Sequence, residues 1–378
     1  MDSDTPKTLV EHLSVLEDVR DPRRRRHLLI DMLMVAITAV ICGADGWTQI
    51  EEFGKSNEAW FRTFLKLPNG IPAHDTFGRV FALLSPEAFQ ERFSAWIESV
   101  RELCEGEEIV AIDGKSLRRS HNRKRGLGPL HMVSAWAVNS RVVLGQQATA
   151  AKSNEITAIP ELLDTLLLRG CIVTIDAMGC QKAIAEKIVE RGGDYVLALK
   201  GNQSSLCEQV EEAFIDADAR DYEGVPSDYY ETVERGHGRS ETRRYWTLGE
   251  LAGIEQKEQW KKLNTIGMVQ SVREVDGHTS SEYRYYIAST GNDAKRFATA
   301  VRGHWGVEND LHWSLDVSFR EDDSRIRERQ AAENFTVLRH IALARLKNEK
   351  TLKRGIKTKR LKAGWDEKYR AKLLFDVL

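Results

Sequence analysis

The chain has 378 residues, of which 42% are apolar and 30% charged, and its formal net charge is −2. This composition is typical of a soluble globular protein with two or three domains, and it excludes a disordered, collagen-like or coiled-coil chain. The longest apolar run, Met32 to Ala44, is shorter than the roughly 20 residues that a membrane-spanning helix needs. We therefore expect a buried helix there and no membrane partner.

Cysteine spacing and the first residues bear on the cellular compartment. The five cysteines form no C-x-x-C pair, and the N-terminus has no basic segment leading into an apolar stretch. These features predict a protein of the reducing cytoplasm, without a secretory signal and without a structural zinc site.

Charge is distributed unevenly along the chain despite the small net charge. Residues 339–378 contain 13 Lys and Arg against 4 Asp and Glu, a net of +9. Residues 205–235 contain 10 acidic against 2 basic residues, a net of −8. Such separation indicates local contacts with a polyanion or, equally, two solvated helical faces.

Residues 1–105 have the pattern of a helical domain. Apolar spacing and Pro or Gly breaks predict helices over 9–16, 28–42, 47–64, 77–84 and from Pro86 onward. The segments 74–84 and 86–96 could form a helix-turn-helix or simply pack as helices.

Residues 106–345 change to an α/β pattern. Short apolar runs predict strands at 109–113, 131–138, 142–150, 171–176 and 194–200. Amphipathic stretches predict helices at 154–168, 181–191 and 204–217. The order β-β-β-α-β-α-β-α indicates a mixed sheet covered by helices.

A second β-rich region lies between 221 and 288, with Asp276-Gly277 as a hairpin turn. Helical spacing returns from 293 to about 348. The final stretch, 346–378, is basic, and we expect it to be a tail that contacts DNA phosphates.

Two predicted strands end in a carboxylate, at Asp113 and at Asp176. The carboxyl ends of strands in an open α/β sheet face the crevice where ligands bind. Two carboxylates brought together repel each other, so a shared divalent cation would stabilise them. The alternative for each Asp is a turn or cap residue after its strand.

A third acidic residue is expected from a helix on the same sheet, and Glu308 is the candidate. It lies between His304 and His312 at four-residue spacing, which would place all three on one helical face. A zinc site remains an alternative, although the spacing differs from that of zinc-binding helices.

Five short motifs follow one another along the chain. They are Asp113-Gly114-Lys115-Ser116, Thr174-Ile175-Asp176-Ala177, Leu199-Lys200-Gly201-Asn202-Gln203, His237-Gly238-Arg239 and the segment from His304 to Val317. In this order they resemble insertion-sequence transposases of the DDE type, in the group that contains the H-repeat-associated proteins of Rhs elements. Residues 74–80 resemble the helical associated domain of that group.

This resemblance implies an α/β fold: a ribonuclease H-like mixed-sheet catalytic core over 106–345, with a β-rich insertion at 204–290. It also implies an N-terminal helical domain over 1–105 that binds DNA. The catalytic residues and metal ligands that it implies are Asp113, Asp176 and Glu308.

One departure from the family pattern concerns the residues around Glu308. Many relatives carry an Arg four residues before this glutamate and a Lys seven residues after it, where this chain has His304 and Leu315. Phosphate contacts of that pair would have to come from elsewhere, such as Arg302 or Arg325. Asp316 and Glu321 are weaker candidates for the third acid.

The implied function is a DNA transposase that uses two Mg²⁺ ions, which Mn²⁺ can replace, to cut and join DNA. Its partners would be double-stranded DNA, at element ends and target, and a second copy of the chain in a homodimer. The alternatives are a metal-dependent nuclease of the same fold and an inactive DNA-binding remnant.

Side chains near the predicted site are candidates for DNA contacts. They are Lys115, Arg118, Arg119, Lys200, Asn202, Gln203, Arg239, Arg302, His304 and Arg325. The alternatives are a solvated turn after Asp113 and a salt-bridged strand face around Arg239. Tyr245 or Trp246 could stack on an unpaired base, or pack in the core.

Overall fold

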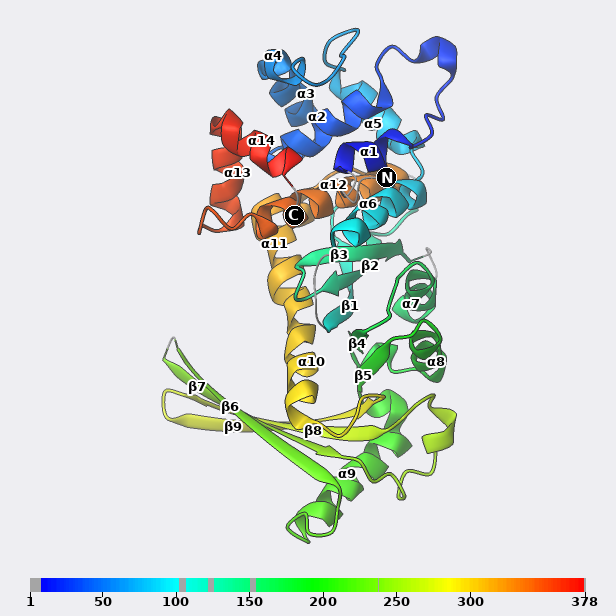
Figure 1. The fold of residues 1–378 in the computed structure, drawn as a ribbon, viewed down its shortest axis with the longest axis vertical. Coiled ribbons are helices and arrows are strands. Elements are labelled where there is room, and N and C mark those ends of the chain that lie inside the picture. Colours follow the sequence, from blue (N-terminus) through cyan, green and yellow to red (C-terminus); the bar gives the residue numbers. More distant parts are fainter. Residues whose placement is uncertain (1–7, 102–106, 122–125, 150–153, 237, 377–378) are drawn as a thin grey trace, which may run out of the picture. The chain divides into compact units, whose positions relative to one another are not determined.

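The computed structural model of the chain describes residues 8–101, 107–121, 126–149, 154–236 and 238–376 (Figure 1). The expected domain boundary at residue 105 and His237 of the fourth motif lie outside these ranges. The chain forms two compact units. The first unit consists of Met1–Gly106, Gly114–Lys152 and Glu308–Leu378, and the second consists of Glu107–Asp113 and Ser153–Val307.

The N-terminal part of the first unit is helical, as predicted. Its helices are α1 (Leu9–Ser14), α2 (Leu29–Ile41), α3 (Trp47–Ser56), α4 (Glu58–Phe61), α5 (His74–Leu83) and α6 (Pro86–Arg101). Every residue of α2 except Ile30 is buried, which explains the long apolar run. In the described part of the chain, no helix is both long and apolar enough to cross a membrane.

The C-terminal part of the first unit is helical too, and it packs on the N-terminal helices. It contains α11 (Trp313–Phe319), α12 (Arg329–Asn348), α13 (Ile356–Trp365) and α14 (Glu367–Phe375). The long helix α12 is buried over most of its length and contacts α2, α5 and α6. The strands β2 (Leu130–Ala137) and β3 (Val142–Ala148) form an antiparallel pair beside it.

Cations of the C-terminal segment cap the C-terminal ends of buried helices. The Arg360 guanidinium donates to the carbonyl oxygen of Val40, near the end of α2, at 2.9 Å. Lys359 donates to the carbonyl oxygen of Leu346, near the end of α12, at 2.8 Å. Helix C-termini carry unpaired carbonyls and a partial negative charge, which cations stabilise. Part of the positive charge of residues 346–378 is therefore buried inside the fold.

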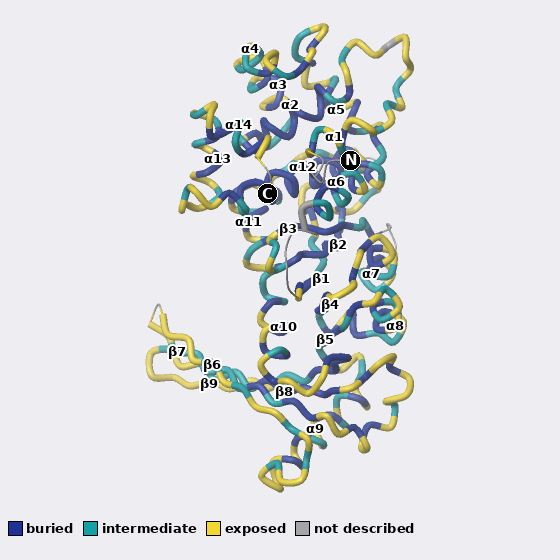
Figure 2. The backbone as a smooth tube through the Cα atoms, viewed as in Figure 1, coloured by how far each residue is buried: buried dark blue, intermediate teal, exposed yellow. Residues whose placement is uncertain are grey.

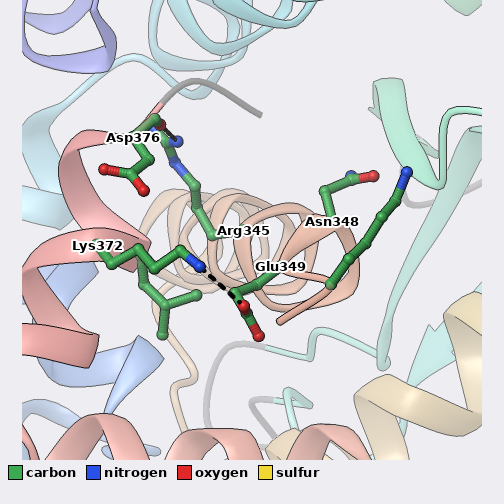
Figure 3. A pocket seen from close by; sticks show the side chains of 7 residues that line it. Arg345, Asn348, Glu349, Lys372 and Asp376 are labelled. Atoms are coloured by element: carbon green, nitrogen blue, oxygen red, sulfur yellow. Dashed lines mark hydrogen bonds and ion pairs between the residues drawn. The ribbon is translucent and has the colours of Figure 1, made fainter. Parts of the chain in front are cut away.

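The end of α12 forms a small polar pocket of about 130 Å³ (Figure 3). Arg345 donates to the carbonyl oxygen of Leu374 at 3.2 Å, which ties α12 to the end of α14. Glu349 accepts hydrogen bonds from Lys372 at 3.3 Å and from the Tyr369 hydroxyl at 2.9 Å. These contacts join the last helices to the rest of the unit.

The second unit is built on a mixed sheet with the strand order β1-β4-β5-β9-β8-β7-β6. The strands are β1 (Glu108–Leu117), β4 (Cys171–Ile175), β5 (Asp194–Ala198), β6 (Ser227–Gly236), β7 (Arg239–Leu248), β8 (Thr265–Val275) and β9 (His278–Ala288). β1, β4 and β5 are parallel, and the remaining pairs are antiparallel. In the first unit, where β1 continues, the order is β3-β2-β1.

The four strands from β6 to β9 form the β-rich region that the sequence predicts. Asp276 and Gly277 connect β8 to β9, and both have positive φ, at 50° and 77°. Positive φ at both central residues is the requirement of a tight hairpin turn, which Asp-Gly meets well. Residues of β6 and of the first half of β9 are mostly exposed, whereas the last residues of β9 are buried (Figure 2).

Helices cover this sheet in the predicted sequence order. They are α7 (Glu155–Asp164), α8 (Lys182–Glu190), α9 (Ser204–Asp218) and α10 (Ala294–Gly306). The sequence order β1, β2, β3, α7, β4, α8, β5, α9 is the one predicted from the sequence. α10 packs on β4, β5, β6 and β7, where Phe297 and Val301 meet Tyr245 in an apolar core. Core packing is therefore the role of Tyr245, which is fully buried.

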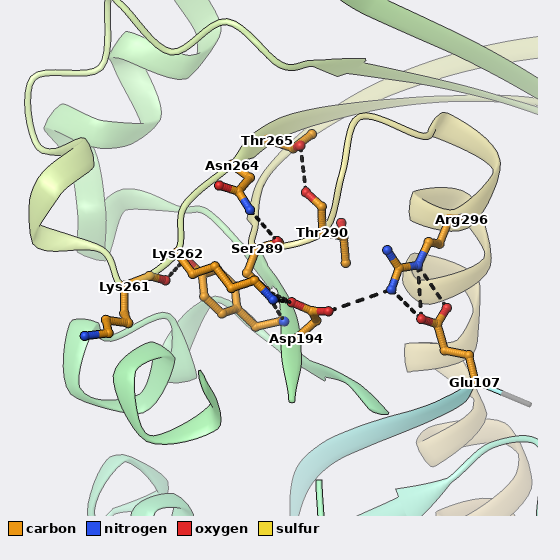
Figure 4. Close-up of polar contacts among 10 residues, drawn as sticks. Glu107, Asp194, Lys261, Lys262, Asn264, Thr265, Ser289, Thr290 and Arg296 are labelled. Atoms are coloured by element: carbon orange, nitrogen blue, oxygen red, sulfur yellow. Dashed lines mark hydrogen bonds and ion pairs between the residues drawn. The ribbon is translucent and has the colours of Figure 1, made fainter. Parts of the chain in front are cut away.

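Ion pairs fix the start of the sheet (Figure 4). Asp194, the first residue of β5, accepts from Ser289 at 2.7 Å and from Lys262 at 2.6 Å. Arg296 of α10 pairs with Glu107, the residue before β1. These contacts hold the amino ends of β1 and β5, whereas Asp113 lies farther along β1 and Asp176 directly follows β4.

Candidate active site

Asp113 and Asp176 lie side by side in the second unit. β1 and β4 are parallel neighbours, with Ile112 opposite Ile175, and each aspartate is the next residue along its strand. Neighbouring strands are about 4.8 Å apart, so the two carboxylates share one edge of the sheet. The strand residues before them are buried, whereas both aspartates are half-buried. The sheet thus brings together the two acids that the sequence singles out.

Asp176 also caps the short helical turn that follows β4. Its Oδ1 accepts from the backbone N–H of Met178 at 3.0 Å and of Gly179 at 3.3 Å. Gly179 is required at this turn, because a Cβ there would approach the Cβ of Ile175 to 3.2 Å and its Cγ2 even more closely. The turn therefore fixes the orientation of the Asp176 carboxylate, so the cap role exists alongside any ligand role.

Two residues after β5 form hydrogen bonds with the backbone of the same turn. The Asn202 side chain donates to the carbonyl oxygen of Ala177 at 2.7 Å, and Gln203 donates to that of Cys180 at 3.0 Å. Lys200, which precedes them, is exposed. The motif Leu199 to Gln203 therefore supports the loop behind Asp176, while Lys200 stays accessible.

His304 of α10 lies at the end of β4. Its Nδ1 is 3.1 Å from the Thr174 hydroxyl. Burial lowers the pKa of His304, and the negative charge of Asp176 opposes this change only in part. The imidazole is therefore neutral at physiological pH. α10 thus brings a hydrogen-bonding but uncharged side chain to the edge where Asp176 lies.

Glu308 lies in a turn of π-helix, Val307–His312, between α10 and α11. It is exposed, and the division between the two units falls between Val307 and Glu308. A π-helical turn has i→i+5 rather than i→i+4 bonding, is rare, and is frequent at functional sites. The expected face of His304, Glu308 and His312 assumes α-helical spacing, which the π-helical turn replaces. His312 instead lies near His340 of α12.

The carboxylate oxygens of Asp113 and Asp176 are the potential metal ligands of the candidate site. Among the residues that the structure describes, no three His, Cys, Asp or Glu side chains lie close enough together to hold a metal ion by themselves. Mg²⁺ is usually held by one or two carboxylates, with waters and substrate phosphates completing its shell. The adjacent pair Asp113 and Asp176 fits Mg²⁺ in this way, whereas zinc prefers His and Cys ligands.

Lys115 lies beyond Asp113 on β1 and is surrounded by acids of the first unit. Its Nζ is 2.6 Å from Asp316 and 2.9 Å from Glu321. Glu321 is 3.3 Å from Arg339, and both of these side chains are only 1% exposed. The two weaker candidates for a third acid, Asp316 and Glu321, are therefore engaged by a lysine that sequence reasoning placed on DNA.

Arg118 and Arg119 follow on the same strand end and pair with the next two acids. Arg118 is 3.1 Å from Asp322, and Arg119 is 3.4 Å from Asp323. Their side chains are 79% and 50% exposed. Ion pairs this exposed contribute little stability, so both arginines can exchange their partners for a phosphate.

The remaining candidate cations lie on different elements. Arg302 of α10 is 3.2 Å from Glu234 of β6, which also binds Arg243 at 3.1 Å. The salt-bridged strand face anticipated for this region is therefore present. Arg239, at the start of β7, and Arg325, between α11 and α12, are exposed.

Comparison with known proteins identifies the family of this chain. Residues 10–97 match the family described as DDE_Tnp_1-associated, and residues 105–345 match the Transposase DDE domain family. The "H repeat-associated putative transposase YhhI" of Escherichia coli K12 is 42% identical over 97% of this chain and 98% of its own length.

Two further relatives match different shares of the chain. The "Putative transposase YncI" of Escherichia coli O157:H7 is 42% identical over 96% of this chain and 93% of its own length. The "Inactive transposase YbfQ" of Escherichia coli K12 is 43% identical over 20% of this chain and 88% of its own length. This chain belongs to the DDE transposase family and is similar, along nearly all of its length, to the H repeat-associated members.

Proposed function

We propose that this chain is a DNA transposase that binds the ends of its element and catalyses DNA cleavage and strand transfer through Asp113, Asp176 and Glu308. The observation that carries the proposal is the register of β1 and β4, which sets the two aspartates side by side in a DDE family chain. Glu308 joins them by its place in the sequence, in a π-helical turn after the helix that packs on β4.

We infer that the core is ribonuclease H-like. The support is the order β3-β2-β1 in one unit and β1-β4-β5 in the other, with β1 common to both. β2 and β3 are antiparallel, whereas β1, β4 and β5 are parallel. The strands from β6 to β9 then form an insertion before Glu308.

The proposed ligands for two Mg²⁺ ions, or for Mn²⁺ in their place, are Asp113, Asp176 and Glu308. Waters and DNA phosphates would complete each shell, because no three such side chains among the described residues form a metal site by themselves. Such a pair of ions, when bound, stabilises the attacking and leaving oxygens of an in-line displacement at phosphorus. The chain itself orients Asp176 through the backbone N–H groups of Met178 and Gly179. Asn202 and Gln203 support the same loop from behind.

The proposed reaction has two displacements. Water attacks the phosphodiester at the element end, which frees a 3′-hydroxyl and a 5′-phosphate. The 3′-hydroxyl then attacks a phosphodiester of the target DNA, and the target's own 3′-oxygen leaves. No covalent bond between protein and DNA is needed, so no nucleophilic side chain is required.

DNA binding would rest on exposed cations of both units and on the C-terminal helices. The first group is Arg118, Arg119, Lys200, Arg239 and Arg325, and the second is Lys350, Lys353, Arg354, Lys357 and Lys368. Bringing two element ends together favours a homodimer on DNA. A protein of this kind acts in the cytoplasm, on the chromosome.

The test uses the full chain and a duplex that carries the short inverted repeats flanking its gene. With Mg²⁺ and a target plasmid, we expect both cleaved ends and joined products. Hydrolysed ends without joined products would identify a nuclease that does not rejoin. Binding without any cleavage would identify an inactive remnant, and neither outcome would be compatible with the proposed transposase.

A further inference from the structure

Lys115 occupies a more enclosed site than the neighbouring cations Arg118 and Arg119. Its side chain is 13% exposed, and its ammonium group contacts three carboxylates, those of Asp316, Glu321 and Asp322. Its ammonium group is therefore fully engaged by acids of its own unit.

Glu321, which pairs with Lys115, also pairs with a second cation, Arg339. Glu321 is 1% exposed and lies between Lys115 and Arg339, whose guanidinium stacks over the Phe335 ring at 4.6 Å. A buried carboxylate needs its cations, because removing one partner of a buried pair leaves an uncompensated charge. Lys115 cannot turn to a DNA phosphate without leaving Glu321 underpaired.

The position of these contacts along the chain gives them a consequence for the proposed site. Lys115 lies two residues after Asp113 on the unbroken strand β1. Asp316 lies in α11, which directly follows the π-helical turn that contains Glu308. The ion pairs of Lys115 with Asp316, Glu321 and Asp322 lie within the first unit. They therefore join the end of the strand that carries Asp113 to the helical segment that carries Glu308.

We propose that Lys115 is a positioning residue, whose ion pairs with Asp316 and Glu321 hold the end of β1 against the segment that follows Glu308. The inference rests on the proposed function, because it assigns Asp113 and Glu308 to the reaction. It gives Lys115 a role different from the phosphate contact that the sequence indicates. We call these three residues, with Arg339, the Lys115 network.

The first experiment tests the network without any need for activity. It compares amide hydrogen exchange in the full-length wild type, Lys115→Met and the control Lys187→Met, which removes a lysine paired with Asp164 at 2.9 Å elsewhere. We expect Lys115→Met to speed exchange in β1 and α11, and Lys187→Met to leave both at the wild-type rate. Unchanged exchange in Lys115→Met would overturn the proposal.

The second experiment uses element-end DNA. We expect Lys115→Met to slow cleavage at saturating DNA on the order of 10- to 100-fold, because a small misplacement of reacting groups has effects of this size. The Mg²⁺ concentration for half-maximal rate should rise, while the Kd for DNA and its salt dependence stay as in the wild type. Lys187→Met should match the wild type in all three.

Two results would overturn the positioning role. Weaker DNA binding with a salt slope reduced by about one would identify Lys115 as a phosphate contact. A lower melting temperature with an unchanged rate and Mg²⁺ requirement would make Lys115 a purely structural residue. A wild type that cuts no element-end DNA would contradict the proposed function. Hydrogen exchange would still show whether the Lys115 network stabilises β1 and α11.

Two milder variants serve if Lys115→Met does not fold. Asp316→Asn removes the 2.6 Å partner, whose side chain is 35% exposed and therefore tolerates the change. We expect it to slow cleavage in the same way but less. Lys115→Arg keeps the charge, and we expect it to restore most of the rate. A normal rate in Asp316→Asn together with no rescue by Lys115→Arg would refute the positioning role.

Discussion

Gly267 of β8 lies directly under the ring of Phe297 of α10. A Cβ added at Gly267 would lie 2.6 Å from Cε2 of that ring, which is closer than real Cβ contacts. Phe297 is buried and packs edge-on against Tyr245 and Tyr286. The absence of a side chain at Gly267 therefore lets α10, the helix that leads to Glu308, sit close to the sheet.

Gly267→Ala should destabilise the protein by about 1–3 kcal/mol, because the added methyl overpacks a buried contact. Urea unfolding of the full chain measures this free energy. Gly253→Ala is the matched control, since a Cβ there meets nothing within 4 Å, and its effect should stay within about 0.5 kcal/mol. Equal stability of the two variants would contradict this account of the α10 contact.

Asp113→Asn, Asp176→Asn and Glu308→Gln should each abolish cleavage and leave binding to element ends nearly intact. Each change keeps the side-chain volume and removes one negative charge from the proposed ligand set. Asn at position 176 still offers an oxygen to the N–H groups of Met178 and Gly179, so the turn should persist.

Cleavage and gel-shift assays on the same preparations check this prediction. The control is Glu274→Gln, which neutralises an exposed acid of β8 and should cut DNA normally. Full Mg²⁺-dependent cleavage by any of the three variants would remove that residue from the site. Full activity in all three would contradict the transposase proposal itself.

Replacing Lys353, Arg354 and Lys357 together by Gln should weaken DNA binding and flatten its dependence on salt. These cations are exposed and, among the described residues, form no ion pair. Each phosphate that the variant no longer neutralises should reduce the slope of log K against log salt by about 0.9.

The control replaces three exposed lysines of the second unit, Lys257, Lys261 and Lys295, by Gln. This variant should bind DNA with the wild-type slope, measured by fluorescence anisotropy over a range of salt concentrations. Equal slopes in both triple variants would show that the C-terminal cations only solvate the surface. Point substitutions are preferable to truncation here, because Lys359 and Arg360 close helices of the first unit.

Glu333→Gln should stabilise the protein in alkaline solution and not in acid. Burial raises the pKa of Glu333 to about 7, and the nearby Glu87 adds to the effect. A raised carboxyl pKa means that the folded state binds the proton more tightly, so ionisation of Glu333 costs stability as the pH rises from about 4.5 through 7.

Thermal unfolding of the wild type and Glu333→Gln at pH 4 and pH 8 measures this difference. We expect similar melting temperatures at pH 4 and a higher one for the variant at pH 8. The control is Glu328→Gln, which changes a nearby exposed acid. A variant that is less stable than the wild type at pH 8 would contradict the raised pKa.

Patterns that are local in sequence were predictable. The order of strands and helices from β1 to α9 follows from apolar runs and turn residues, and Asp276-Gly277 marks its hairpin. The adjacency of Asp113 and Asp176 follows as well, because the alternation makes β1 and β4 neighbours. The predicted strand end at Asp113 was wrong, since β1 continues to Leu117. A few adjacent residues determine each helix, strand and turn, and the alternation of strands and helices determines which strands are neighbours.

Features that depend on distant residues were not predictable in this way. The sequence predicts Lys115 as a phosphate contact. In the structure, its ammonium group instead pairs with Asp316 and Glu321, which lie some 200 residues away in the sequence. The spacing of His304, Glu308 and His312 predicts one face of an α-helix, whereas the structure has a π-helical turn there. A count of net charge likewise cannot separate the buried Arg360 from the exposed Lys357.

The contacts of Arg360 with the carbonyls of α2 have a consequence for biosynthesis. Arg360 lies 320 residues from Val40. Nearly the whole described chain must therefore be synthesised before Arg360 can bind the carbonyl groups of α2. The first unit therefore completes its folding only after the second unit has left the ribosome, whereas Ser153–Val307 can fold during translation. A frameshift or early stop after Glu308 would release a protein that keeps every proposed catalytic carboxylate and still lacks a finished first unit. Truncation late in the chain would thus leave the first unit unfinished even though the proposed catalytic carboxylates remain.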